Sequence, residues 1–403
     1  MDNLIYWVWI TQTFGVANHR IWEVLDDFHN VKEAYEALKS GEYPALTVGE
    51  KNSIKTTHLA QSKKLIDFCN SKEYRIIAFD DNGYPDRLRG IFNPPPILFC
   101  MGDLSYIDDE VVITVVGARH PSDYSIKFAK RICSELVKIG VVLVSGFALG
   151  IDSMAHRAAL QNNSRTVAVL GCGLDVDYPI PNSDVKKVIA KRGAVITEFF
   201  PGTRPNGGNF PIRNRILSGL SLGTLVVEAG MQSGSLITAE HALQQGRDVF
   251  CVPPYDLFDE KCCGVIRLIR DGAIPTFSHL DIVYEYYENF SHKINSAESN
   301  DNYAVVEESC LCSEKVAEQR DSFRKRVKAQ KSEKQLPAIV VDYDELTDEQ
   351  AKIVHILEKN GATQADELAS QAGMSSSDTL SLLTELELYG IVQAAAGLVY
   401  SLD

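Results

Sequence analysis

Two stretches of the sequence decide the fold: VVITVVGARH at 111–120 and VVLVSGFALGID at 141–152. Each begins with a run of aliphatic, mostly β-branched residues and ends in a turn that contains glycine. A strand that is apolar along its whole length is typical of a parallel sheet covered on both faces. Working outward, the same pattern predicts strands at Val111–Val116, Val141–Val144, Thr166–Leu170, Ala194–Thr197, Thr224–Val227 and Asp248–Val252.

Segments with helical periodicity separate these strands along the chain. Strands that alternate with helices indicate an α/β domain with a doubly wound sheet. We therefore predict an extended Rossmann-like domain with a parallel sheet over residues 71–286. Its helices are predicted at Ile126–Ile139, Ile151–Gln161, Asp184–Lys191, Arg213–Leu220 and Ser235–Gln245.

The flanks of this domain predict three further regions. Residues 1–70 have helical spacing and predict a small helical domain of the SAM or helix-hairpin-helix type, with Phe14–Ala17 resembling the hairpin turn. Residues 287–343 are polar, include a basic run at Arg320–Lys334, and predict a flexible linker. Residues 344–403 predict a winged helix, with helices at Ala351–Glu358, Ala365–Ala372 and Ser377–Leu388 before a short hairpin.

Charge and composition narrow the function classes. The 403-residue chain has a formal net charge of -14, yet residues 111–280 carry 18 Lys and Arg against 14 Asp and Glu. This distribution argues against general nucleic-acid binding and is compatible with a local phosphate site. No apolar run approaches the roughly 18 residues of a membrane helix, and no signal peptide is evident. The nine cysteines lack zinc-site spacing, so we expect reduced thiols and a cytoplasmic protein.

Gly, Ser and Arg residues follow most of the predicted strands. In an open parallel sheet, ligands bind beyond the carboxyl ends of the strands, and helix N-termini there favour anions. Because several such loops would share one edge of the sheet, the sequence predicts a phosphate-binding surface. Its candidate residues are Gly117, Arg119, Ser145, Gly146, Gly150, Gly171, Gly173, Asn209, Phe210, Arg213, Asn214, Arg215, Ser233, Gly234, Ser235 and Thr238.

The sequence contains no recognisable catalytic constellation. The dinucleotide fingerprint G-x-G-x-x-G does not follow the first strand, and there is no Walker lysine motif. His120 and His156 have no evident nucleophile partner, so we expect packing or capping roles for them. Asp152 and Glu228 lie near strand ends, where acids either bind metals or, more often, organise loop amides. We therefore predict a binding protein and not an enzyme, with no cofactor and no metal.

The C-terminal domain has an unusual charge pattern for a winged helix. No Lys or Arg follows Lys359, and the third predicted helix carries Asp378, Glu385 and Glu387. Since phosphate neutralisation supplies most DNA affinity, this domain should not bind DNA by itself. We interpret it as a protein-interaction module.

Five motifs together resemble the DprA/Smf family of DNA-processing proteins. The resemblance covers about residues 75 to 280, and the motifs come in the family's order. They read VGAR at 116–119, SGFALGIDSMAH at 145–156, GCGLDVDYP at 171–179, FPIRNRI at 210–216 and SGSLIT at 233–238. The resemblance implies binding and protection of single-stranded DNA, loading of the recombinase RecA during natural transformation, and a homodimer formed through the Rossmann-like domain. It also implies that Arg119 is a main DNA contact.

The sequence departs from the family pattern in several places. Leu149 and Ile180 stand where family members often carry a cation. Two missing cations should weaken phosphate binding by roughly one to two logs at moderate salt. Lys186, Arg204 or the basic linker are candidates to compensate. Further departures are Ala118 in place of serine, Pro254-Tyr255 in place of Gly-Ser, and Ile266 in place of asparagine.

Two alternative functions remain open on the sequence. The segment Gly223–Glu228 looks related to the P-G-G-x-G-T-x-x-E motif of phosphoribohydrolase-type enzymes with a similar sheet, but it lacks the Pro-Gly-Gly and its acid comes one residue late. The second alternative is a nucleotide-sensing regulator with the winged helix as its output. The missing cations on that helix argue against this second alternative.

Overall fold

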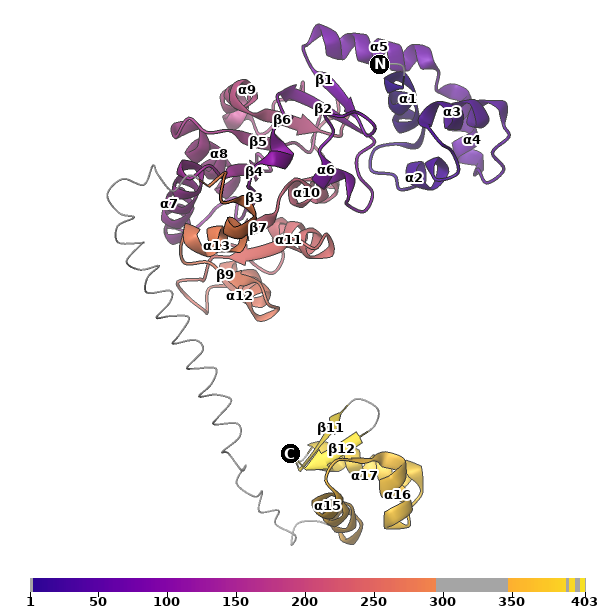
Figure 1. Ribbon diagram of the computed structural model, residues 1–403, viewed down its shortest axis with the longest axis vertical. Helices are drawn as coiled ribbons and strands as arrows, with labels where there is room; N and C mark the ends of the chain where they lie inside the picture. The colour runs from indigo at the N-terminus through magenta and orange to yellow at the C-terminus, as the bar shows by residue number, and fades with distance from the viewer. Residues whose placement is uncertain (1–2, 295–346, 389–390, 396–398, 403) are drawn as a thin grey trace. The chain divides into compact units, whose positions relative to one another are not determined.

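The computed structural model describes residues 3–294, 347–388, 391–395 and 399–402, which belong to two compact units (Figure 1). The first unit is Met1–Asp301 and the second is Asn302–Asp403. Most of the predicted linker, including the basic run at Arg320–Lys334, lies outside the described residues.

Within residues 3–294 the centre is a nine-stranded sheet. Its strands are β1 Arg75–Ala78, β2 Ile97–Gly102, β3 Val112–Val116, β4 Val142–Ser145, β5 Thr166–Val169, β6 Ala194–Thr197, β7 Gly223–Val226, β8 Asp248–Cys251 and β9 Ile274–Pro275. They lie in the order β1-β2-β6-β5-β4-β3-β7-β8-β9. From β6 to β9 all neighbours are parallel, whereas β2 runs antiparallel to both β1 and β6. The predicted Rossmann-like parallel sheet is confirmed, and each predicted strand agrees within one residue at either end.

Helices cover both faces of this sheet. The alternation of side chains along each strand separates the two faces. Val144 and Val169 pack in one core with Ile216, whereas Ala168 and Val195 pack in a second core with Ile189. The helices between the predicted strands are α7 Asp123–Lys138, α8 Ile151–Gln161, α9 Ser183–Arg192, α10 Asn209–Leu220 and α11 Gly234–Gln244.

Residues 3–71 form the predicted helical region. Its helices are α1 Leu4–Phe14, α2 Arg20–Leu25, α3 Val31–Ser40, α4 Val48–Thr56 and α5 Leu59–Ser71, and α1 contacts the other four. Trp9 and Ile10 of α1 are completely buried, in the same core as Phe99 of β2 and Ala168 of β5. This region therefore shares a hydrophobic core with the sheet and is part of the same compact unit.

The predicted linker, residues 287–343, begins too early. A capping box at Ser278 begins α13 His279–Phe290, and this helix continues past residue 287. Ile294 is also buried. The apolar positions Ile282, Val283 and Tyr286 are buried, which extends the ordered domain to at least residue 294.

The described part of the second unit is a winged helix, as predicted. Its helices are α15 Asp348–Asn360, α16 Ala365–Ala372 and α17 Ser376–Leu388. A three-stranded sheet of β10 Thr363–Gln364, β12 Val399–Leu402 and β11 Val392–Ala395, in that order, completes it. Ile353, Leu368 and Leu383 are fully buried at its centre. In neither unit is any described helix both long and apolar enough to cross a bilayer.

Candidate functional site

The strand order defines where a ligand can enter. From β3 the chain moves to β4, β5 and β6 on one side, and then returns to β7 on the other side of β3. The loops after β3 and β7 therefore diverge at a topological switch point, which is where doubly wound sheets bind ligands. A cleft with a cavity volume of about 290 Å³ opens there.

Most of the predicted site residues meet at this cleft and at the smaller hollow beside it. Those of the predicted set that line the cleft are Gly117, Arg119, Phe210, Arg213, Asn214, Ser233, Gly234, Ser235 and Thr238. The hollow, of about 60 Å³, is lined by Arg119, Gly146, Gly171 and Phe210 of the predicted set. Arg119 and Phe210 belong to both, so they form the boundary between the two cavities.

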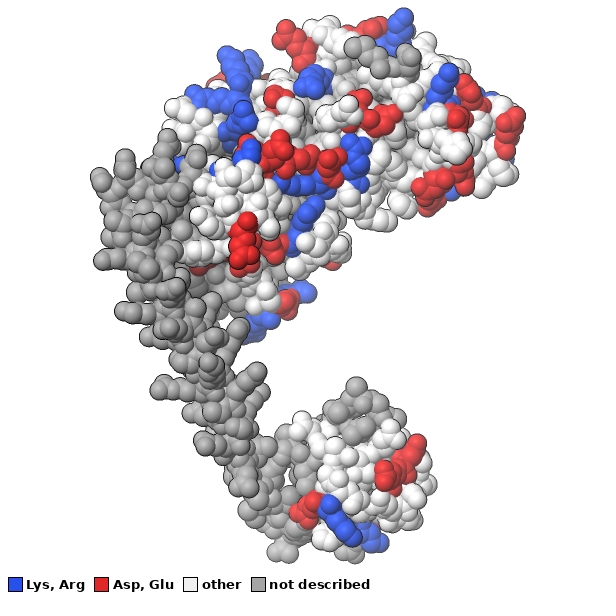
Figure 2. Space-filling model, in the orientation of Figure 1, with Lys and Arg blue, Asp and Glu red and all other residues white. Residues whose placement is uncertain are grey.

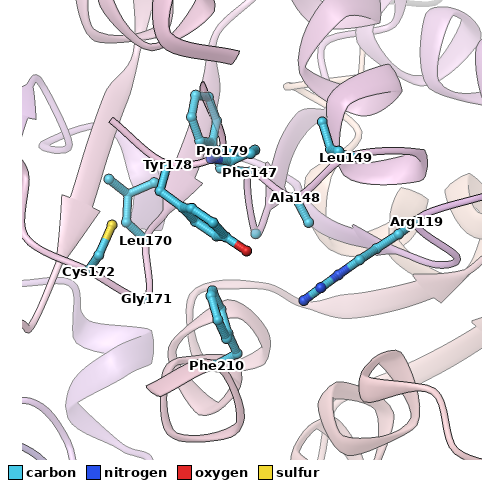
Figure 3. Close-up of a pocket in the computed structure, with 11 residues that line it drawn as sticks. Arg119, Phe147, Ala148, Leu149, Leu170, Gly171, Cys172, Tyr178, Pro179 and Phe210 are labelled. Carbon is cyan, nitrogen blue, oxygen red and sulfur yellow. The ribbon is translucent and has the colours of Figure 1, made fainter. Parts of the chain in front are cut away.

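An exposed cation and two aromatic rings face each other in the hollow (Figure 3). The Arg119 guanidinium carbon lies 5.7 Å from the centre of the Phe210 ring. The centre of that ring lies 5.8 Å from the centre of the Tyr178 ring, and Tyr178 is 36% exposed. A guanidinium suits a phosphate, and an exposed ring suits the face of a base. Sequence reasoning left Tyr178 out of the site, although it belongs to the GCGLDVDYP motif.

Two glycines are required by this geometry. A Cβ on Gly171 would lie 2.8 Å from Cδ1 of Phe210, so a side chain at 171 would displace the ring from the hollow. Gly150 has a φ of +80°, and a Cβ there would collide with the carbonyl oxygen of Ala118. A side chain at 150 would therefore disturb the turn that carries Arg119.

Arg213 lines the cleft but is almost completely buried, and it holds two strand ends together. It is 5% exposed and donates from Nη1 to the carbonyl oxygens of Gly146, at 2.6 Å, and Val169. Burial lowers the pKa of Arg213 to about 10. Burial also raises the pKa of Asp152, whereas the Arg213 charge and the backbone N–H of Ala148 lower it. Arg213 thus links the loop after β4 to the end of β5.

The structure corrects the expected role of Arg215. It is 7% exposed, lines neither cavity, and forms a two-pronged ion pair with Glu198 at 2.5 and 2.7 Å. Its Nε donates to the carbonyl oxygen of Asn93 at 3.0 Å. With its donors engaged inside the protein, Arg215 supports α10 and is not placed to contact a phosphate.

The remaining predicted residues shape the loops without lining the cavities. Ser145 is fully buried and donates to the carbonyl oxygen of Val115 at 2.6 Å. Asn209 donates from Nδ2 to the carbonyl oxygen of Gly171 at 3.1 Å. A Cβ on Gly173 would lie 2.7 Å from Oδ1 of Asp175, so this turn has no room for a side chain. These positions hold the strand-end loops in place around Phe210.

The N-terminus of α11 lies at the cleft. Ser233 caps this helix by accepting the N–H of Ser235 at 3.4 Å, and Ser233, Gly234 and Ser235 all line the cleft. The first turn of an α-helix favours an anion. A phosphate in the cleft would therefore lie between this helix end and the Arg119 side chain.

The acids and the histidine near the site have internal partners. Glu228 is 1% exposed and accepts from the Ser122 hydroxyl at 2.5 Å and the Ser125 hydroxyl at 2.7 Å, at the start of α7. This is the loop-organising role that the sequence favoured for it. His156 is fully buried beside Thr166, at 2.9 Å, and burial lowers its pKa to about 3. A neutral, inaccessible imidazole is a packing residue.

The prediction that Lys186 compensates for the missing cations is wrong. Lys186 is 5% exposed and donates to the carbonyl oxygens of Leu174 at 2.5 Å and Val176 at 2.9 Å, so its ammonium group cannot reach a phosphate in solution. Arg204 is exposed. Leu149, at 37% exposed, lines the hollow and leaves its edge uncharged.

Charged side chains are dispersed over the face of the first unit seen in Figure 2. Blue and red side chains alternate there, and no continuous basic surface covers it. On this face, binding of an anionic ligand would therefore depend on a local site more than on a long-range field.

These observations define a class: a doubly wound α/β protein with a candidate phosphate- and base-binding site at its switch point. The family model for DNA recombination-mediator protein A matches residues 75–287, and the model for the DprA winged helix domain matches residues 341–397. The chain belongs to the DprA/Smf family of DNA-processing proteins.

Individual relatives agree with this assignment. The DNA processing protein DprA of Streptococcus pneumoniae is 35% identical over 286 residues, which cover 70% of this chain and 98% of the relative. The DprA of Bacillus subtilis is 41% identical over 212 residues, covering 53% of this chain and 71% of the relative. The X-ray structure of the S. pneumoniae protein matches with a TM-score of 0.62 at 33% identity, over 70% of this chain and 97% of that one.

Proposed function

We propose that this protein binds single-stranded DNA at the switch point of its sheet, without catalysing a reaction. The observation that carries the proposal is the placement of the exposed Arg119 guanidinium next to the rings of Phe210 and Tyr178. Binding of single strands combines cations that meet phosphates with aromatic side chains on which bases stack. Both partners are present in one hollow.

The same geometry favours single strands over duplex DNA. A base can lie against Phe210 or Tyr178 only if it has left its own stack. The proposed ligand is therefore an unpaired strand with its phosphate between Arg119 and the α11 N-terminus.

We further propose that the bound strand is passed to the recombinase RecA during DNA uptake, in the cytoplasm, by a homodimer. This part of the proposal draws on membership of the DprA/Smf family. A candidate dimer surface exists on the loop after β8, where Leu257 is 66% and Phe258 is 92% exposed. Exposed neighbouring apolar side chains of this kind are frequent at protein interfaces.

The winged helix is proposed as a protein-interaction module. The described first turn of α16 carries Asp366 and Glu367, and that of α17 carries Asp378. No Lys or Arg follows Lys359 in the sequence. Without cations to neutralise phosphates, DNA affinity should be low, whereas a basic protein surface would be attracted.

The phosphoribohydrolase alternative gains no support from the site. Its candidate acid, Glu228, is buried and accepts from Ser122 and Ser125. A general acid or base must reach the reacting atoms, and this carboxylate faces the start of α7 instead.

Fluorescence anisotropy with labelled oligonucleotides tests the proposed function. The full chain should bind single-stranded oligonucleotides more tightly than the matched duplex, with an affinity that falls as salt increases. Equal affinity for both forms would contradict the proposal, and so would release of free base from nucleoside monophosphates.

Leu149, an uncharged residue that lines the hollow, is the basis of a gain-of-function prediction. Leu149→Lys should raise the affinity for single strands by about threefold to tenfold near 0.1 M salt and steepen the salt dependence by about 0.7, the contribution of one added phosphate contact. Leu243→Lys is the matched control, because Leu243 is also exposed, at 55%, but lines neither cavity. If both variants gain equally, net charge and not the site is responsible.

A further inference from the structure

A second exposed aromatic platform lies outside both cavities. Phe92, between α6 (Asp86–Arg89) and β2, is 75% exposed, whereas Ile91 before it is 6% exposed and buried against α10. His19, also exposed, stacks on it with ring centres 4.6 Å apart and planes 29° apart. The Phe92 side chain is thus exposed, while the preceding Ile91 belongs to the core.

The loop that carries Phe92 is rigidly anchored. Asn93 donates from Nδ2 to the carbonyl oxygen of Ala17 at 2.7 Å. Trp22 donates to the carbonyl oxygen of Pro94 at 3.0 Å, and Tyr84 donates to that of Pro95 at 2.8 Å. An aromatic ring on a fixed backbone loses little conformational freedom when a ligand stacks on it.

The platform is connected to the proposed DNA site through α10. Phe210 lies in the first turn of this helix, and Ile212, 37% exposed, follows it on the surface. Arg215 donates to the carbonyl oxygens of both Ile212, at 3.1 Å, and Asn93, at 3.0 Å. The same buried arginine therefore positions the start of α10 and the loop that presents Phe92.

The chemistry of the platform suits a nucleobase. Two stacked planar rings offer a flat face, and every base has a π-face that can continue such a stack. The nearest cation in the sequence, Arg20, is already paired with Glu23 at 2.7 Å and Glu50 at 3.1 Å. Arg20 is therefore not a free cation beside the platform, and the interaction proposed for the two rings is stacking.

We propose that the His19–Phe92 pair is a base-stacking subsite for a single strand whose phosphate is held at Arg119. The inference rests on the proposed function and extends it from the hollow, along α10, to the N-terminal helical region. It assigns to that region a direct role in holding DNA, in addition to its packing on the sheet.

Oligonucleotide length separates the two sites. Phe92→Ala should weaken binding of a strand of about 20 nucleotides by about tenfold, which is within the range of base stacking on one aromatic side chain. It should leave unchanged the binding of a strand of about 5 nucleotides, which spans only the hollow. The salt dependence should not change, because no phosphate contact is removed. Phe92→Trp should retain binding and Phe92→Leu should lose it.

Photocrosslinking provides a direct readout. A strand of about 20 nucleotides substituted with 5-iodouracil should crosslink to the peptide that contains Phe92. The inference would be overturned if Phe92→Ala left the affinity for long strands unchanged. It would also be overturned if the variant changed the oligomeric state instead of the affinity for DNA. If Arg119→Ala loses binding while Phe92→Ala does not, only this inference fails. If Arg119→Ala also binds normally, the proposed function fails with it.

Discussion

Replacing Arg119 with alanine should weaken binding to single-stranded oligonucleotides by roughly ten- to a hundredfold at moderate salt. Arg119 is exposed and is the cation at the boundary of the hollow and the cleft. Its loss removes a charged hydrogen bond to a phosphate and the support that its guanidinium gives the Phe210 ring at 5.7 Å. The slope of log affinity against log salt should fall by about 0.7, the value for one phosphate on a single strand.

Two matched variants separate charge from shape. Arg119→Lys keeps the charge but loses the planar fork, so its affinity should lie between wild type and Arg119→Ala. Arg131→Ala removes an exposed arginine of α7 that lines neither cavity, and it should bind as the wild type does. Because Arg119 is at the surface, the thermal midpoint should not change. Wild-type affinity in Arg119→Ala would show that the DNA site lies elsewhere.

The sheet was predictable because its signal is local. Strands such as Val112–Val116 and Val142–Ser145 are buried on both faces, so each is mainly apolar, and a glycine or serine lies at its end or directly after it. By contrast, β2 at Ile97–Gly102 was missed. It follows Pro94–Pro96 and pairs antiparallel with β1 and β6, one of which lies almost a hundred residues away. That pairing leaves no periodic signal in the sequence.

The site was predictable in its location but not in the roles of its arginines. Arg119, Arg213 and Arg215 all lie in motifs at the strand ends, so all three were candidates for phosphate binding. The partners that separate them are distant in sequence: Gly146 is 67 residues from Arg213, and Asn93 is 122 residues from Arg215. A guanidinium fork is equally suited to carbonyl oxygens, a carboxylate or a phosphate, so only the fold decides which of these it meets.

Removing one member of the Arg215–Glu198 pair should have the largest effect on stability. Glu198 is 1% exposed and Arg215 is 7% exposed, and two N–H···O bonds join them. Glu198→Ala leaves the Arg215 charge buried without its counter-ion, which should lower the free energy of unfolding by about 3–5 kcal/mol. Urea unfolding of the full chain should show an earlier transition for the first unit.

The matched control is an ion pair at the surface. Arg267 and Asp271 lie 3.4 Å apart, but their side chains are 65% and 56% exposed, so Asp271→Ala should cost less than about 1 kcal/mol. The double variant Arg215→Met/Glu198→Leu should recover much of the stability lost in Glu198→Ala, because no unpaired charge remains inside. Its affinity for long single strands should nevertheless be lower than that of the wild type, because the loop around Asn93 has lost the arginine that holds it beside α10. A double variant no more stable than Glu198→Ala would mean that the packing of these side chains, and not their charge, supports α10.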